Sequence, residues 1–185
     1  MLDLKMITKT WTLFLDRDGV INIEKHLDYI YHYGEFRFYD GAKEAIRYLS
    51  NHFKRIIVIT NQRGVGRELM TEEELLSIHN QMLADIESSG GRIHKIYYCT
   101  STDNAHPNRK PNPGMFLEAQ NDFPDIHPDK SIMVGNNLSD MEFGRNAGMH
   151  TVFVKTTDPG QPLPHPFIDL AFNDLAAFAK ALQEA

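Results

Sequence analysis

Five short, largely apolar runs, each followed by a polar segment, limit what this chain can fold into. They occupy residues 10–15, 55–60, 93–99, 130–135 and 150–155. Continuous apolar runs of this length are typical of strands that are buried on both faces of a parallel sheet. Because the carboxyl ends of parallel strands meet at one edge of the sheet, we expect the polar segments to gather there, where such folds bind ligands.

Segments with helical periodicity separate these runs. Residues 41–52 carry apolar side chains on one helical face, and residues 71–86 begin with a capping box formed by Thr71 and Glu74. Further helices are predicted over residues 114–122, 141–147 and 174–183, and a short edge segment over residues 168–171. Strands that alternate with helices in this way predict a three-layer, Rossmann-like α/β fold, with helices on both faces of a parallel sheet.

The chain of 185 residues is long enough for one substantial core, and no linker rich in proline, glycine or serine divides it. We expect a single domain over residues 1–185, in which residues 1–9 form an extension that can be flexible. We expect no large cap domain. We expect the protein to be a monomer or a weak homo-oligomer. The net charge of −6 argues against nucleic acid and anionic membranes as partners, and no apolar stretch is long enough to cross a bilayer. The single cysteine suits a reducing, cytoplasmic compartment.

The first polar segment belongs to the sequence LFLDRDGVIN, in which Asp16 and Asp18 directly follow a predicted strand. Two such carboxylates are costly unless a cation offsets their repulsion, and Mg2+ binds carboxylate and phosphate oxygens. An ionised Asp16 can attack phosphorus to give an aspartyl-phosphate, while Asp18 can protonate the leaving oxygen and later deprotonate water. Thr60 and Lys110, in later polar segments, can stabilise the phosphoryl oxygens. Together these residues predict phosphoryl transfer.

Four ordered motifs carry a resemblance to a known family. LFLDRDGVIN, TNQRGVGRE, NRKPNPGMF and MVGNNLSDMEFGRNAGM resemble the motifs of the haloacid dehalogenase (HAD) superfamily of phosphatases. More narrowly, they are similar to the branch that contains heptose bisphosphate phosphatases and histidinol-phosphate phosphatases, and nearly the whole chain takes part in the resemblance. It implies a HAD-like fold, Mg2+ as cofactor, a small phosphorylated metabolite as substrate and a role in carbohydrate metabolism.

The resemblance also assigns roles to individual residues. The catalytic residues that it implies are Asp16 as nucleophile, Asp18 as acid and base, and Thr60 and Lys110 as stabilisers of the phosphoryl group. The substrate-binding residues that it implies are Glu24, His26, Asn61, Gln62, Arg63 and Arg109. The family's Mg2+ is held by the first Asp, by the backbone carbonyl of the second, and by an acidic residue of the fourth motif.

The fourth motif departs from the family pattern, which usually reads GDxxxD. Here the first acidic position is Asn136, whereas Asp140 is retained. An amide oxygen can still bind Mg2+, although it lacks the charge of a carboxylate and should bind more weakly. We therefore expect Asn136 to be a metal ligand alongside Asp16 and Asp18, with Asp140 supporting the metal directly or through water.

A second departure concerns zinc. Many members of the branch carry a four-ligand zinc loop, but the corresponding positions here are Cys99, Ser101, His106 and Asn108. Two ligands do not close a tetrahedral site, so structural zinc is not expected. Histidines in the loops, among them His26 and His32, are candidates for substrate contacts, although such residues more often have structural roles.

These observations predict a Mg2+-dependent phosphomonoesterase that acts through an aspartyl-phosphate on a small phosphorylated sugar such as a heptose bisphosphate. Histidinol phosphate is the alternative substrate. The alternative of another class is a catalytically weak or inactive protein that binds phosphorylated ligands, because Asn136 removes one ligand charge.

Overall fold

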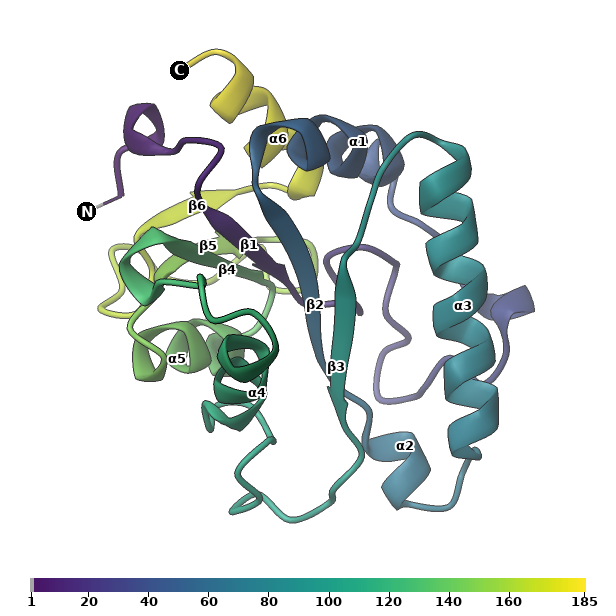
Figure 1. Ribbon diagram of the computed structural model, residues 1–185. Helices are drawn as coiled ribbons and strands as arrows, with labels where there is room; N and C mark the ends of the chain where they lie inside the picture. Colours follow the sequence, from purple (N-terminus) through teal and green to yellow (C-terminus); the bar gives the residue numbers. More distant parts are fainter. Residues whose placement is uncertain (1) are drawn as a thin grey trace.

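The computed structural model describes residues 2–185, in which six parallel strands form one sheet in the order β3-β2-β1-β4-β5-β6 (Figure 1). The strands are β1 (Thr12–Leu15), β2 (Arg55–Asn61), β3 (Lys95–Cys99), β4 (Ser131–Gly135), β5 (His150–Val154) and β6 (Leu170–Phe172). The chain adds β2 and β3 on one side of β1, and then returns to the other side of β1 with β4. The sheet therefore has a switch point between β1 and β4, which is where open α/β sheets bind ligands.

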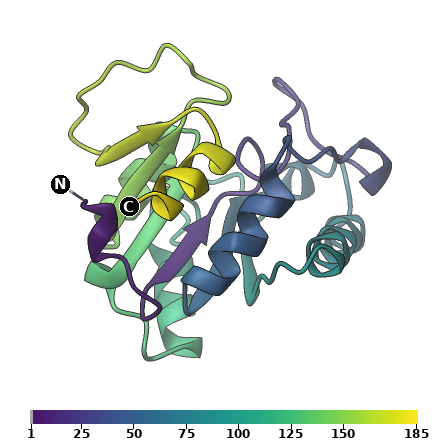
Figure 2. The ribbon, with the colours of Figure 1, turned by 90° about the horizontal axis from the view of Figure 1, so that it is seen from above.

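Helices cover both faces of the sheet. They are α1 (Ala42–His52), α2 (Arg63–Gly66), α3 (Glu72–Ser88), α4 (Gly114–Asp122), α5 (Leu138–Asn146) and α6 (Leu175–Gln183). Helices α1, α3 and α6 pack on one face and α4 and α5 on the other, and Figure 2 shows α1 and α6 side by side. Short 3-10 helices occupy Leu4–Met6, Tyr33–Glu35 and Pro128–Lys130.

Alternate residues of β1 contribute to two separate cores. Leu13 and Leu15 belong to the core beneath α1, α3 and α6, whereas Phe14 belongs to the core beneath α4 and α5. In register, Phe14 lies between Ile57 of β2 and Met133 of β4. The strand is therefore buried on both faces, which explains why its sequence is apolar without alternation.

The predicted fold class is confirmed, and so is the capping box of α3, in which the side chains and backbone N–H groups of Thr71 and Glu74 bond reciprocally. The strands β1, β3 and β6 begin two residues later than predicted, and two helices differ more. Helix α2 was not predicted, because its four residues carry no periodic apolar pattern. Helix α5 begins at Leu138 rather than Met141, because the Asn137 N–H donates to Asp140 Oδ2 at 3.0 Å and stabilises an earlier first turn.

The amino-terminal segment packs onto the domain. Leu2 and Ile7 are buried against the core, and Asp3 caps the first 3-10 helix through the Lys5 N–H. Met1 of the predicted extension lies outside the described residues. Within residues 2–185, no helix combines the length and apolar character needed to cross a membrane.

Candidate active site

A cavity of about 150 Å3 opens at the switch point of the sheet. The residues that line it are Asp16, Asp18, Glu24, Thr60, Asn61, Lys110, Asn137, Ser139 and Asp140. An adjoining cavity of about 150 Å3 shares Asp18, Glu24 and Asn61 with it and extends toward Gln62 and Tyr29. The polar segments that follow β1, β2, β3 and β4 therefore meet at one edge of the sheet, as the sequence predicts.

The ammonium group of Lys110 lies among the buried acids of this cavity. Its Nζ is 3.0 Å from Asp16 Oδ1 and 2.7 Å from Asp140 Oδ1, and it donates to the carbonyl of Ile59 at 2.9 Å. Burial alone would lower the pKa of Lys110, but the two carboxylates raise it above its usual range. Lys110 therefore remains charged and joins the end of β1 to the first turn of α5.

Asp16 continues the ladder of β1, since its backbone N–H donates to the Val134 carbonyl at 3.0 Å. Its Oδ1 pairs with Lys110 and accepts from the Arg17 N–H at 2.7 Å, whereas Oδ2 has no such partner within residues 2–185. Burial raises the pKa of Asp16 to about 7 although Lys110 opposes the rise, and the charges of Asp140 and Asp18 add to it. The unoccupied oxygen is the one that can reach a cation or a phosphorus atom.

Asp18 lies two residues further on in a different environment. Its Oδ1 accepts from Asn22 Nδ2 at 2.9 Å, its Oδ2 accepts from Gln62 Nε2 at 2.8 Å, and Arg17 Nη2 pairs with the carboxylate at 2.9 Å. Burial alone would raise the pKa of Asp18, but the Arg17 guanidinium and these hydrogen bonds lower it. Asp18 is therefore held as a carboxylate, the form that can accept a proton from water.

The residues at the carboxyl end of β2, together with Gln62, organise another wall of the cavity. Gln62 Nε2 also donates to Thr60 Oγ1 at 2.8 Å, which links the Thr60 hydroxyl to Asp18. The Asn61 side chain donates to the Lys110 carbonyl at 3.2 Å and accepts from the Lys110 N–H at 3.1 Å. Asn61 thus fixes the backbone of the loop that carries Lys110, while its part in substrate binding stays a prediction.

Asn136 follows β4 and is only 1% exposed. Its Nδ2 donates to Thr157 Oγ1 at 2.8 Å and to Glu24 Oε2 at 3.3 Å, but its buried Oδ1 has no partner within residues 2–185. A buried acceptor without a partner is costly, and a hard cation would satisfy it. The oxygen donors of this region, from Asp16, Asp18 and Asn136, are of the kind that Mg2+ binds.

Two glycines permit the close approach of these side chains. Gly19 has a φ of 85°, and a Cβ atom built on it would lie 2.1 Å from Asn136 Nδ2. A Cβ atom on Gly135 would lie 2.2 Å from the Cβ of Asp140. Any larger residue at either position would displace a side chain of the site.

Two arginines, Arg63 and Arg109, lie next in sequence to Gln62 and Lys110, which line the two cavities. Arg63 Nη2 and Arg109 Nε both donate to Asn104 Oδ1, at 2.6 and 3.2 Å, and Arg63 Nε is buried without a partner within residues 2–185. Burial and the neighbouring Arg63 lower the pKa of Arg109. Both guanidinium groups meet on a neutral amide rather than a carboxylate, and neither arginine lines the cavity at the switch point or the adjoining one.

Other predicted residues lie outside the two cavities. His26 is exposed and is absent from the lining of both. Cys99 Sγ lies 3.6 Å from His106 Nδ1, and within residues 2–185 no three His, Cys, Asp or Glu side chains form a group that could hold a metal. The absence of structural zinc stays a prediction.

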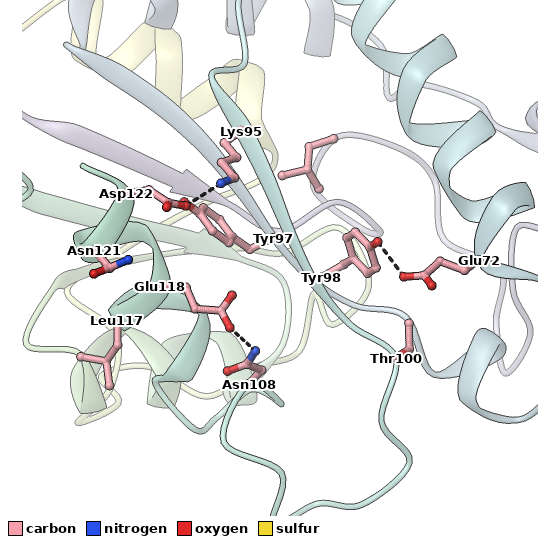
Figure 3. Close-up of a pocket in the computed structure, with 11 residues that line it drawn as sticks. Glu72, Lys95, Tyr97, Tyr98, Thr100, Asn108, Leu117, Glu118, Asn121 and Asp122 are labelled. Atoms are coloured by element: carbon pink, nitrogen blue, oxygen red, sulfur yellow. Dashed lines mark hydrogen bonds and ion pairs between the residues drawn. The ribbon is translucent and has the colours of Figure 1, made fainter. Parts of the chain in front are cut away.

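A larger hollow, of about 760 Å3, lies beside the edge strand β3 and helix α4 (Figure 3). Its polar groups already bond to one another: Tyr98 donates to Glu72 at 2.7 Å, and Asn108 donates to Glu118 at 2.6 Å. It shares no lining residue with the cavity at the switch point. Size alone therefore does not mark the functional site of this protein.

Sequence reasoning missed Arg17, Asn22 and His79 as parts of the site. Arg17 is 1% exposed and bonds to both Asp18 and His79, which is buried on α3. The signal for His79 was its position on the apolar face of a predicted helix, between Leu75 and Met82. A polar side chain on such a face needs a buried partner.

A parallel sheet with paired aspartates at its switch point and a buried lysine opposite them defines a HAD-like phosphatase. In agreement, residues 107–166 match the HAD-hydrolase-like family. The chain is also similar to the crystal structure of the D,D-heptose 1,7-bisphosphate phosphatase from B. bronchiseptica, complexed with magnesium and phosphate. The TM-score is 0.84 at 28% identity, over 95% of this chain and 99% of that one.

Similar sequences narrow the family. The D-glycero-alpha-D-manno-heptose-1,7-bisphosphate 7-phosphatase of Campylobacter jejuni is 39% identical over 146 residues, which cover 79% of this chain and 83% of that protein. The D-glycero-beta-D-manno-heptose-1,7-bisphosphate 7-phosphatase of Yersinia pestis is 33% identical and covers 92% of this chain and 94% of its own length. This chain belongs to the family of D-glycero-D-manno-heptose-1,7-bisphosphate 7-phosphatases, and the predicted superfamily and branch are confirmed.

The raised pKa of Asp16 predicts how the metal-free protein responds to pH. A carboxyl group whose pKa is higher in the folded state stabilises the fold at low pH, and this stabilisation is lost as pH rises from the ordinary value of 3.8 through about 7. Asp16→Asn removes the titration. We expect the stability of the variant relative to the parent to rise with pH across this range, by roughly 4 kcal/mol between pH 3.8 and pH 7. Urea denaturation with a chelator at several pH values measures the difference.

Asp18→Asn is the matched control, and we expect it to change the stability in the opposite direction. Because the pKa of Asp18 is lowered in the fold, the ionised group stabilises the protein above its ordinary pKa. This variant should be less stable than the parent at neutral pH, and the difference should shrink as pH falls. If the free energy of unfolding of Asp16→Asn changed with pH in the same way as that of the parent, burial of the Asp16 charge would not be costly, and the prediction would be wrong.

Proposed function

We propose that this chain is a Mg2+-dependent phosphomonoesterase that forms an aspartyl-phosphate on Asp16. The observation that carries the proposal is the arrangement around Lys110, whose Nζ lies 3.0 Å from Asp16 and 2.7 Å from Asp140. A fixed positive charge beside a carboxylate with one unoccupied oxygen is what an in-line attack on phosphorus requires. The family of the chain supports the same reaction.

We assign Mg2+ to three oxygen donors, which are the Asp16 carboxylate, the Asp18 backbone carbonyl and Asn136 Oδ1. When bound, the cation would neutralise charge on the phosphoryl oxygens. Both oxygens of Asp140 are engaged, Oδ1 by Lys110 and Oδ2 by the Asn137 N–H. We therefore propose that Asp140 supports the site through Lys110. The relative from B. bronchiseptica was crystallised with magnesium and phosphate.

The first step joins Asp16 to the phosphoryl group. Asp16 Oδ2 attacks phosphorus while the bond between phosphorus and the ester oxygen breaks, and the leaving oxygen takes a proton from Asp18. The Thr60 hydroxyl and the Lys110 ammonium stabilise the phosphoryl oxygens during the transfer. The products of this step are the free alcohol and the aspartyl-phosphate.

The second step releases phosphate. Asp18, now ionised, takes a proton from a water molecule, and the oxygen of that water attacks phosphorus while the bond to Asp16 breaks. The carboxylate of Asp16 and the proton on Asp18 are thereby restored. In the metal-free protein the lowered pKa of Asp18 favours the carboxylate, which is the form that accepts this proton, so the first step requires Asp18 to take up a proton when the phosphate ester binds.

For the substrate we propose a heptose 1,7-bisphosphate that loses its 7-phosphate. The relatives from Campylobacter jejuni and Yersinia pestis are named for this reaction on the alpha and beta anomers. Such a substrate keeps a second phosphate, and Arg63 and Arg109, next in sequence to Gln62 and Lys110, meet on the neutral amide of Asn104 rather than on a carboxylate. Guanidinium groups bind phosphate through paired hydrogen bonds. A cytoplasmic location, and a monomer or weak homo-oligomer, remain predictions from the sequence.

The catalytic proposal predicts turnover that depends on both Mg2+ and Asp16. We expect Asp16→Asn to lower kcat by about 1000-fold or more, because the amide is a poor nucleophile. Phosphate release from heptose 1,7-bisphosphate, histidinol phosphate and an aryl phosphate, with Mg2+ and with chelator, measures this. Asp158→Asn is the control, since it makes the same change at an exposed position.

Two outcomes would count against the proposal. Equal turnover by the parent and Asp16→Asn would remove Asp16 from the chemistry, and tight binding of the phosphorylated ligand without turnover would favour the non-catalytic alternative. A higher kcat/KM for histidinol phosphate than for the heptose bisphosphate would reverse the proposed order of substrates.

The two arginines predict recognition of the second phosphate. We expect Arg63→Ala to raise KM for the 1,7-bisphosphate by roughly tenfold, because a charge-assisted hydrogen bond contributes about 1.5–3 kcal/mol. The same change should leave KM for heptose 7-phosphate within about twofold. Steady-state kinetics on both substrates measures the contrast, with the exposed Arg92→Ala as control. Equal losses on both substrates would place Arg63 at the reacting phosphate instead.

The uncharged ligand at position 136 predicts weak binding of Mg2+. Replacing Asn136 by Asp adds a carboxylate where the amide oxygen lacks a partner. We expect the Mg2+ affinity of Asn136→Asp to rise by roughly tenfold, because ligand charge sets the affinity of such sites. Calorimetric titration of the metal-free protein with Mg2+ measures this directly. An unchanged affinity would place the ligand elsewhere, with Asp140 as the nearest acid of the same motif.

A further inference from the structure

A buried histidine on α3 connects to the site through a single arginine. His79 is 3% exposed, and its Nε2 lies 3.1 Å from Arg17 Nη1. Arg17 can only donate, so His79 Nε2 must accept this hydrogen bond. Burial and the neighbouring Arg17 charge lower the pKa of His79 to about 3, so the ring is neutral and can serve as the acceptor at any pH near neutrality.

The other end of the same guanidinium group holds Asp18. Arg17 Nη2 lies 3.0 Å from Asp18 Oδ1 and 2.9 Å from Asp18 Oδ2. The guanidinium plane is rigid, so a contact that fixes one of its nitrogens also fixes the direction of the other. His79, Arg17 and Asp18 therefore form a continuous chain of contacts from the middle of α3 to the Asp18 carboxylate in the loop after β1.

Packing alone does not account for a histidine at this position. His79 lies on the buried face of α3 with Leu75, Ile78 and Met82. An aliphatic side chain there would fill the space without the free-energy cost of removing a polar group from water. Its ring also packs edge-on against Tyr98 at 5.6 Å between centroids, a contact that phenylalanine could make equally well. An apolar residue at this position could not accept a hydrogen bond from Arg17.

We propose that His79 is a positioning residue for proton transfer, which orients the Asp18 carboxyl group through Arg17. The proposal rests on the proposed function, in which Asp18 gives its proton to the leaving oxygen as Asp16 bonds to phosphorus. Without the acceptor on His79, Arg17 can rotate and Asp18 loses its alignment with the leaving oxygen. Misplacement of the acid should slow reactions in proportion to their need for protonation.

The test compares substrates that differ in this need. The leaving group of p-nitrophenyl phosphate departs without a proton, whereas the alkoxide of a sugar phosphate requires one. We expect His79→Phe to lower kcat/KM for heptose 1,7-bisphosphate by roughly tenfold or more, and for p-nitrophenyl phosphate by less than about twofold. The ratio kcat/KM is used because it reports the steps up to the departure of the leaving group.

Variants of graded reach separate positioning from folding. His79→Gln keeps an acceptor that reaches Arg17 and should restore most of the sugar-phosphate activity, whereas the shorter His79→Asn should not. These two polar variants decide the question if His79→Phe fails to fold. Tyr98→Phe is the control, because it leaves the ring against His79 and removes only the hydroxyl that donates to Glu72.

The outcomes distinguish a failure of this inference from a failure of the proposed function on which it rests. Equal losses on both substrates, or equal activities of the Gln and Asn variants, would overturn the positioning role of His79. Loss of the proposed function itself would appear instead in the parent, as turnover that is insensitive to Mg2+ or to Asp16→Asn. A selective loss on the sugar phosphate that Gln rescues is the result that we expect.

Discussion

The buried ammonium group of Lys110 is the charge on which the rest of the site depends. Without it, Asp16 and Asp140 would be two like charges buried close together with no counter-charge, and removing one partner of a buried ion pair costs about 3–5 kcal/mol. The loop after β3 has to carry Lys110 past β2 to reach them, and the Asn61 side chain fixes that loop by bonding to both backbone groups of Lys110. The strand ends, the loop and the first turn of α5 are therefore held together by electrostatics as well as by packing.

The two aspartates of the first motif show how one loop creates opposite environments. Burial raises the pKa of Asp16, whereas Arg17 and two amide donors lower that of Asp18. Arg17, the residue between them, has a part in both environments, since its backbone N–H bonds to Asp16 and its guanidinium pairs with Asp18. Two carboxyl groups of the same chemical type thereby acquire different pKa values in the metal-free protein, and a cation bound beside Asp16 would favour the ionised form that a nucleophile requires.

The sequence predicted the fold and the meeting of the polar segments because both follow from short apolar runs separated by amphipathic helices. Asp16, Thr60, Lys110 and Asp140 line one cavity for the reason that the carboxyl ends of parallel strands share an edge. The sequence could not predict that Asn61 would bond to Lys110, or that His79 would accept from Arg17, because each pair joins residues that are distant along the chain. Helix α2 was missed for a local reason, since four residues are too few to show a period.

The neighbouring Glu24 gives a physical reason for an uncharged residue at position 136. Asn136 donates to Glu24, which lines the same cavity as Asp16 and Asp18, and burial together with the charges of Asp18 and Asp140 raises the pKa of Glu24. The cavity therefore contains a further carboxyl group, supplied by the loop after β1 rather than by the end of β4. A carboxylate at position 136 would lie within hydrogen-bond distance of the Glu24 carboxyl group and would raise the pKa of Glu24 further, so that part of the charge gained for a cation would be offset by proton uptake. Asn136 and Glu24 thus act as a matched pair, in which the amide accommodates an acid that a carboxylate would repel.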